Sequence, residues 1–96
     1  VTETKRDREI REEVALLSKA QTALSRGRPQ EALAALAEHA QRFPRGVLTE
    51  ERAATRARTL CALGRIGEAK AELKRIAKLN PTSAYLARAR ESCGLP

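Results

Sequence analysis

Few side chains in this sequence could support acid–base or nucleophilic chemistry. The 96 residues contain one histidine, His39, and one aspartate, Asp7. A catalytic triad, a carboxylate pair or a metal cluster needs several such groups close together, and no convincing set can be assembled. Gly27 and Gly64 are isolated, which is typical of turns and not of a phosphate-binding loop. We therefore expect no enzymatic activity, no cofactor and no metal site, with His39 packed beside an apolar stripe.

The basic side chains are the other candidates for chemistry. The net charge is +7, and 14 of the 19 basic residues are arginines. Such a charge is typical of a protein that binds an anionic partner, either nucleic acid or an acidic peptide. It is also typical of a solvated helical surface in an arginine- and alanine-rich chain. Because the basic residues are spread along the sequence and not clustered, we favour the second interpretation for any single arginine.

Helical periodicity and stop signals divide the chain into five segments. Residues 2–26 have apolar positions at helical spacing and stop at a glycine, with residues 1–12 forming a charged helical extension. A second helix begins at Pro29 and ends before Pro44, because the residue before a proline disfavours the helical region. Thr49 is the predicted cap of a third helix, a fourth covers 66–79, and Thr82 or Ser83 caps a fifth. No segment has the pattern of a β-strand.

An internal repeat relates these helices. Residues 20–44 and 57–81 align without gaps at a spacing of 37, and ten positions are identical: Ala20/Ala57, Thr22/Thr59, Gly27/Gly64, Arg28/Arg65, Glu31/Glu68, Ala32/Ala69, Ala34/Ala71, Leu36/Leu73, Ala40/Ala77 and Pro44/Pro81. The glycine permits a tight turn, the alanine lets paired helices touch, and the leucine fills the gap between neighbouring pairs. A repeat of this period indicates a helical solenoid. We expect a hairpin over 13–43, a second over 48–80 and a terminal helix over 83–93.

These residues resemble the tetratricopeptide repeat. The family's small residue, turn glycine, second-helix alanine, large apolar residue and closing proline match Ala20, Gly27, Ala32, Leu36 and Pro44, and their equivalents in the second copy. The resemblance covers about residues 13–93 and implies an all-α, right-handed superhelix of two and a half hairpins.

The spacing of 37 exceeds the usual period of about 34. In this respect the chain is similar to repeats of bacterial envelope proteins, such as outer-membrane assembly lipoproteins and division-coordinating periplasmic proteins. It does not resemble the chaperone-binding subset, because the positions that hold Lys and Asn in that subset are Leu17, Gln21 and Thr55 here.

The resemblance implies a non-catalytic protein–protein interaction or scaffold module. It also implies a groove lined by the odd-numbered helices, and the candidate groove residues are Leu17, Gln21, Arg58, Tyr85 and Arg88. The implied partner is another protein or peptide, for which an acidic sequence would suit the arginines. A nucleic-acid-binding domain acting through the basic surface is the alternative, but two aromatic residues offer little for base stacking.

The resemblance also suggests where such a module belongs. Because the sequence lacks methionine, we interpret it as a fragment, the C-terminal part of a larger bacterial envelope-associated or regulatory protein. A cell-envelope location is favoured over a cytoplasmic one, and no segment of the fragment is apolar enough to insert into a membrane. Two and a half repeats are near the minimum for stability, so homodimerisation or docking onto the parent protein would help.

The two cysteines allow two interpretations. In a stacked array Cys61 and Cys93 fall near the same end of two neighbouring, like-oriented helices. A disulfide between them is feasible in an oxidising compartment. Alternatively, they are two independent buried thiols that pack as small hydrophobic groups.

Overall fold

The computed structural model describes residues 2–96, which form five α-helices and no β-strand. The helices are α1 (Lys5–Ser25), α2 (Pro29–Arg42), α3 (Thr49–Ala62), α4 (Ile66–Leu79) and α5 (Ala84–Ser92). The predicted all-α repeat fold is therefore confirmed. None of these helices combines the length and the apolar character that crossing a membrane requires.

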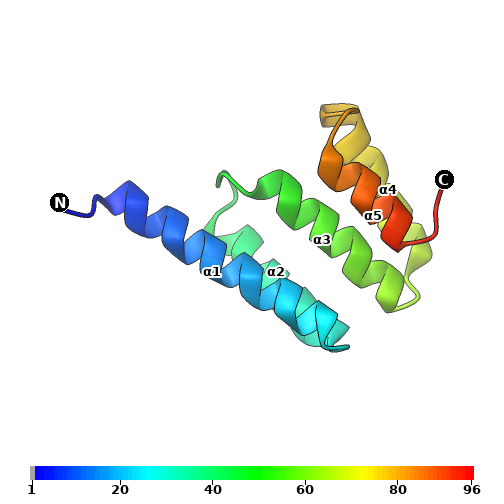
Figure 1. Ribbon diagram of the computed structural model, residues 1–96, viewed down its shortest axis with the longest axis horizontal. Helices are drawn as coiled ribbons and strands as arrows, with labels where there is room; N and C mark the ends of the chain where they lie inside the picture. Colours follow the sequence, from blue (N-terminus) through cyan, green and yellow to red (C-terminus); the bar gives the residue numbers. More distant parts are fainter. Residues whose placement is uncertain (1) are drawn as a thin grey trace.

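The helices form two antiparallel hairpins and a single closing helix. α1 pairs with α2, α3 pairs with α4, and α5 packs mainly on α3. In Figure 1, α1, α3 and α5 lie side by side on the near face, while α2 and α4 lie behind them. The odd-numbered helices thus share one face of the molecule, which we call the α1–α3–α5 face.

The ends of the helices follow the signals in the sequence, with one correction. Gly27 and Gly64 adopt φ values of +74° and +75° directly after α1 and α3, a conformation that glycine tolerates best. Ser83 caps α5 by accepting a hydrogen bond from the Leu86 N–H. Thr49, by contrast, is not a cap: it is the first residue of α3, and no side chain at the N-cap position fulfils this role. The prediction for Thr49 was wrong because the cap comes from another helix, as described below.

The core is built from alanines at the helix contacts and larger side chains between them. Ala20, Ala32, Ala57 and Ala69, the small residues of the repeat, are all 0% exposed. One cluster contains Leu16, Leu17, Ala20, Ala35 and Leu36; the other contains Ala54, Ala57, Leu73, Ile76, Leu86 and Ala89. Small residues let the helix axes approach closely, so a chain with only 2% aromatic residues can still bury a core.

Candidate peptide-binding face

A small hollow lies where α1, α3 and α5 meet. Its volume is about 50 Å³, and its lining residues are Gln21, Glu51, Ala54, Thr55, Arg58, Tyr85 and Arg88. The α3 members follow i, i+3, i+4, i+7 spacing, which places them on one side of that helix. Tyr85 and Arg88 are separated by three residues and therefore share one side of α5. Three helices thus each contribute to one site.

Four of the five candidate groove residues line this hollow, and the fifth does not. Gln21, Arg58, Tyr85 and Arg88 come together there. Leu17 is only 2% exposed and belongs to the apolar core between α1 and α2. The groove assignment for Leu17 is therefore corrected: its side chain supports α1 from beneath and cannot contact a partner.

A hydrogen-bonded set of polar side chains joins α1 to α3 at the edge of the hollow. The Gln21 Nε2 donates to Glu51 Oε1 at 3.0 Å and lies 3.4 Å from Thr55 Oγ1. The Thr55 hydroxyl donates in turn to the carbonyl oxygen of Glu51 at 2.9 Å. Glu51 lines the hollow although it is not one of the groove residues expected from the sequence. These bonds fix the Gln21 side chain in place.

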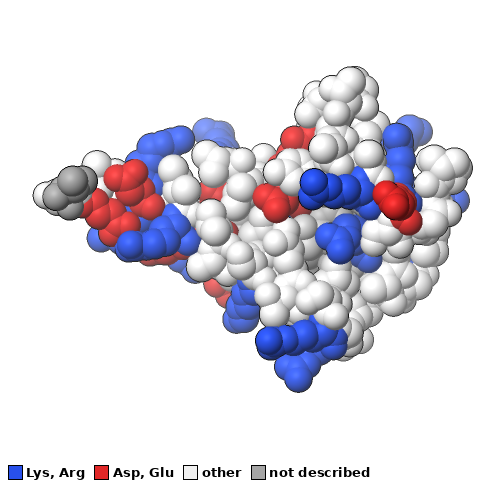
Figure 2. Space-filling model, viewed as in Figure 1, with Lys and Arg blue, Asp and Glu red and all other residues white. Residues whose placement is uncertain are grey.

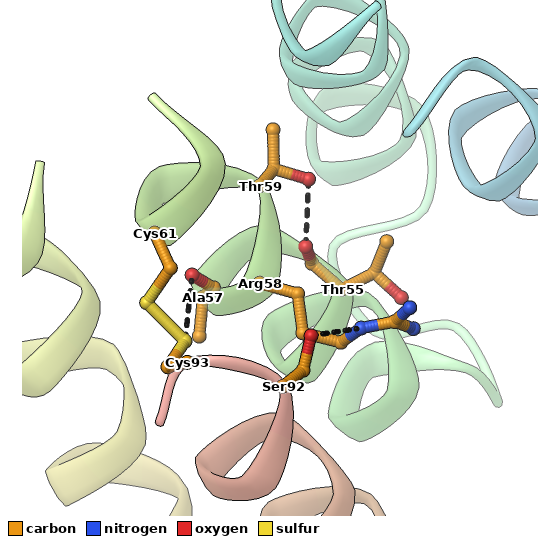
Figure 3. The surroundings of a disulfide bond; sticks show 7 residues. All are labelled: Thr55, Ala57, Arg58, Thr59, Cys61, Ser92 and Cys93. Atoms are coloured by element: carbon orange, nitrogen blue, oxygen red, sulfur yellow. Dashed lines mark hydrogen bonds between the residues drawn. A yellow bond between two sulfur atoms is a disulfide. The ribbon is translucent and has the colours of Figure 1, made fainter. Parts of the chain in front are cut away.

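The two arginines of the hollow have no acidic partner. Among residues 2–96, no carboxylate oxygen lies within 4.0 Å of a guanidinium nitrogen of Arg58 or Arg88. Arg58 Nε donates to the Ser92 hydroxyl at 3.4 Å, across the gap between α3 and α5 (Figure 3). Both guanidinium groups therefore keep donors for an external carboxylate, which they can bind in a bidentate geometry.

The charge of the whole face is mixed. Figure 2, viewed from the same side as Figure 1, shows basic side chains next to acidic ones where α3 faces α5, and a largely uncharged surface across the middle of the molecule. Tyr85, 37% exposed, adds an aromatic ring with a polar tip to the arginines. An apolar ring beside unpaired guanidinium groups suits a peptide better than it suits a uniformly charged polymer.

A disulfide fixes α5 against α3 next to this hollow. Cys61, near the end of α3, is joined to Cys93, which directly follows α5, and their Cα atoms are 5.6 Å apart. Figure 3 shows the bond beside the Arg58–Ser92 contact. Tyr85 and Arg88 project from the short helix that this bond ties down, so the disulfide helps to position two of the hollow's residues.

His39 lies in the interior and does not line the hollow of the α1–α3–α5 face. Its ring is 0% exposed, with Nδ1 3.2 Å from Arg52 Nη1 and Nε2 3.4 Å from Glu13 Oε1. The pKa of His39 is lowered from its ordinary value of 6.5 because burial disfavours the charged ring, and the charge of Arg52 adds to the effect; Glu13 opposes both. Since an arginine N–H can only donate, Nδ1 is the acceptor and the ring proton resides on Nε2, facing Glu13. His39 is thus a packed residue of the interior.

The structure shows no arrangement typical of a metal site. Within residues 2–96, no group of three or more His, Cys, Asp or Glu side chains could hold a metal ion. The chemistry that the α1–α3–α5 face offers is hydrogen bonding by two guanidinium groups, an amide and a phenol, beside the Glu51 carboxylate and the Thr55 hydroxyl.

Comparison with known proteins identifies the fold. A family model described as the tetratricopeptide repeat matches residues 23–93. Comparisons with characterised proteins and with solved structures gave no significant match. The family match covers both turn glycines, both closing prolines and the terminal helix. Because it spans well over half of the sequence, the chain belongs to the tetratricopeptide repeat family.

Proposed function

We propose that this chain is a non-catalytic interaction module that binds an extended peptide segment of a partner protein on its α1–α3–α5 face. The observation that carries the proposal is the convergence of Gln21, Arg58, Tyr85 and Arg88 from three helices on one hollow. Protein–protein interaction is the usual role of tetratricopeptide repeats. The hollow adds a specific place and a specific chemistry to that role.

The size and charge of the hollow indicate what it would accept. Its volume of about 50 Å³ is far below the roughly 300–1,000 Å³ of small-molecule and cofactor pockets, so it suits one side chain of a longer ligand. Arg58 and Arg88 have no carboxylate of their own, which favours an Asp or Glu side chain there. Tyr85 would pack on the neighbouring residue of the same peptide. The partner is therefore an acidic peptide segment.

A nucleic acid is a poorer fit to this face. The chain has one Tyr and one Phe, and the Phe43 ring already contacts the Arg42 guanidinium, 5.1 Å from its centroid, and the His39 ring. Tyr85 alone would have to stack bases, whereas single-strand binding surfaces use several aromatic rings.

The disulfide supports a location for the module. Disulfides form and persist in oxidising compartments, and Cys61–Cys93 holds the helix that carries Tyr85 and Arg88. We therefore place the module in the extracytoplasmic part of a larger bacterial envelope-associated or regulatory protein, where it would recruit a partner for that protein.

Site-specific photo-crosslinking in the producing cells tests the function. A photo-reactive phenylalanine analogue at Tyr85 should trap a protein, whereas the same analogue at Lys70, exposed on α4, should not. The trapped protein is then purified, and its affinity is measured for the unmodified chain and for Arg58→Gln/Arg88→Gln. We expect the double substitution to weaken binding about tenfold or more, because both carboxylate contacts are lost.

Two results would overturn the proposal. One is crosslinking at position 85 to nucleic acid, with an affinity that falls steeply as salt rises. The other is a protein partner whose affinity is unchanged in the double arginine variant, because that partner would not be using this hollow.

A further inference from the structure

A second surface of the molecule also gathers basic side chains, on the side of α3 away from the hollow. The residues Arg52, Ala53 and Arg56 point in nearly the opposite direction from Glu51, Thr55 and Arg58, since each residue turns the helix by about 100°. Two adjoining hollows of about 450 and 400 Å³ lie there, and Arg52, Ala53 and Arg75 line both. We call this continuous surface the arginine groove.

The two halves of the arginine groove have apolar walls. Toward α2 the wall consists of Leu33, Leu36, Ala37 and Ala40, and toward α4 it includes Ile76 and Leu79. Leu79 is 82% exposed, more than any other large apolar side chain in the described chain. At the rim of this groove, Leu79 adds to the apolar walls a side chain that a second molecule can cover.

The centre of the arginine groove carries more positive than negative charge. Arg56 Nη1 and Arg75 Nη2 both bind Glu72, which is 7% exposed; the Arg56 contact is 3.3 Å. Arg52 has only neutral hydrogen-bond acceptors, the Phe43 carbonyl oxygen at 3.0 Å and the His39 ring. Arg56 and Arg75 therefore share one carboxylate, and among residues 2–96 Arg52 has no carboxylate within 4.0 Å.

Two further carboxylates, Glu13 and Glu50, lie near the groove, and within residues 2–96 neither is within 4.0 Å of a guanidinium nitrogen of Arg52, Arg56 or Arg75. Glu13 acts on Arg52 through space, but backbone N–H groups of Val47 and Leu48 occupy its oxygens. Glu50, in the α4-side hollow, accepts from the Asn80 side chain at 2.8 Å. Burial lowers the pKa of Arg52, and the positive charge of Arg75 adds to this effect, while Glu13 and Glu72 oppose it. An incoming carboxylate between Arg52 and Arg75 would relieve that repulsion.

We propose that the arginine groove binds an acidic segment of a partner protein. A carboxylate of that segment lies between Arg52 and Arg75, and its apolar neighbours occupy the two hollows and cover Leu79. The groove combines positive charge with apolar walls. An acidic peptide segment with apolar neighbours complements both features, and a nucleic acid backbone does not. This surface is separate from the α1–α3–α5 face, so the chain can hold two segments at once and act as a bridge between them.

Selection from displayed peptides tests this assignment on the complete, disulfide-bonded chain. Short random peptides are selected on the unmodified chain and depleted on Arg75→Glu, which keeps those that need this groove. Arg75 and Leu79 are largely exposed, so Arg75→Glu and Leu79→Ser should fold normally, as circular dichroism will check. Lys74→Glu is the matched control, because it makes the same charge change one residue away on α4, outside both hollows.

We expect the surviving peptides to carry Asp or Glu flanked by Leu, Ile or Phe. Arg75→Glu and Leu79→Ser should each weaken their binding about tenfold or more, and Lys74→Glu less than about twofold. The proposal is overturned if no peptide survives depletion, if the survivors lack acidic residues, or if Lys74→Glu weakens binding as much as Arg75→Glu. Displacement of the peptides by duplex DNA with the same dependence on Arg75 would overturn it in favour of nucleic acid.

Discussion

Glu13 Oε1 accepts a 2.8 Å hydrogen bond from the backbone N–H of Leu48, so a side chain of α1 caps the N-terminus of α3. The other carboxylate oxygen accepts from the Val47 N–H at 3.1 Å. Helix N-termini leave unpaired N–H groups and carry partial positive charge. A carboxylate accepts hydrogen bonds from these groups and is attracted by this charge. Glu13 is only 2% exposed, which makes it the main polar link between the two hairpins.

Glu13→Gln should therefore destabilise the fold. We expect the free energy of unfolding to fall by about 2 kcal/mol, because a buried charged acceptor is replaced by an amide that can offer only one oxygen to two donors. The matched control is Glu50→Gln, at the equivalent position of the next hairpin, where the carboxylate bonds only to Asn80. That change should cost less than about 1 kcal/mol. Urea unfolding measures both; equal losses would contradict the capping role.

Gly46 should also be sensitive to substitution, because a side chain at this position would meet the buried Glu13 carboxylate. A Cβ added there would lie 2.1 Å from Glu13 Oε1 and 2.4 Å from its Cδ. We expect Gly46→Ala to destabilise by about 1–3 kcal/mol. Gly67→Ala, within α4 and with nothing inside 4 Å of the added Cβ, should instead stabilise by about 0.5 kcal/mol.

A double-mutant cycle separates the steric cause from a backbone cause. In a Glu13→Ala background the carboxylate is gone, so Gly46→Ala should cost much less than in the parent chain. An unchanged cost would show that the Gly46 backbone, and not the Glu13 side chain, sets the requirement.

The buried position of Glu13 beside Gly46 could not be predicted from the sequence. On α1 the apolar Val14 is 45% exposed, whereas its charged neighbour Glu13 is buried. The burial of a charged residue can be predicted only when its partners are known. Here the partners are backbone N–H groups 34 and 35 residues away. One feature of the sequence did indicate that α3 needs a cap from elsewhere. Ser83, which caps α5, corresponds to Gly46 in the first copy, and glycine has no side chain to act as a cap.

Local signals did predict the architecture, and the family resemblance implied four of the residues that line the hollow. Turn glycines and closing prolines fix where helices end, and these features depend on neighbouring residues only. Gln21, Arg58, Tyr85 and Arg88 line one hollow because repeat geometry brings the same side of each odd-numbered helix to one face, and their role in binding stays a prediction. The residues that α4 contributes to the arginine groove, Arg75 and Glu72, could not be predicted, because their contacts with α3 depend on how α3 and α4 cross.

Lowering the pH should weaken the fold through His39. The folded-state pKa of His39 lies below its ordinary value of 6.5, so below pH 6.5 the unfolded chain binds a proton that the folded chain resists. Stability contributed by the neutral ring is complete above that pH and declines as the pH falls toward the folded pKa. We expect the free energy of unfolding to decrease between pH 7 and 5.

His39→Gln isolates this effect. The substitution removes the titrating ring between Glu13 and Arg52 while keeping a polar side chain, so the slope of stability against pH should flatten in this window even if the overall stability changes. Urea unfolding at several pH values measures the slope. An unchanged slope in the variant would assign the pH dependence to other groups.

Reduction of Cys61–Cys93 should loosen α5 and leave the first hairpin intact. The bond closes a loop with a sequence separation of 32, for which chain entropy predicts a stabilisation of about 4 kcal/mol. α5 has nine residues, too few to be helical alone, and its buried contacts are chiefly Leu86 and Ala89. Reductant should therefore speed hydrogen exchange of the α5 amides far more than that of α1 and α2. A Cys61→Ala/Cys93→Ala chain should not respond to reductant.

Reduction of the disulfide should change the affinities of the two proposed binding surfaces differently. Tyr85 and Arg88 lie on α5, so reduction should weaken the partner of the α1–α3–α5 face, whereas the arginine groove, built from α2, α3 and α4, should keep its affinity. Parallel affinity measurements with and without reductant make the comparison. Two titratable thiols in the unreduced, unfolded chain would contradict the bond itself, and equal weakening at both surfaces would contradict their independence.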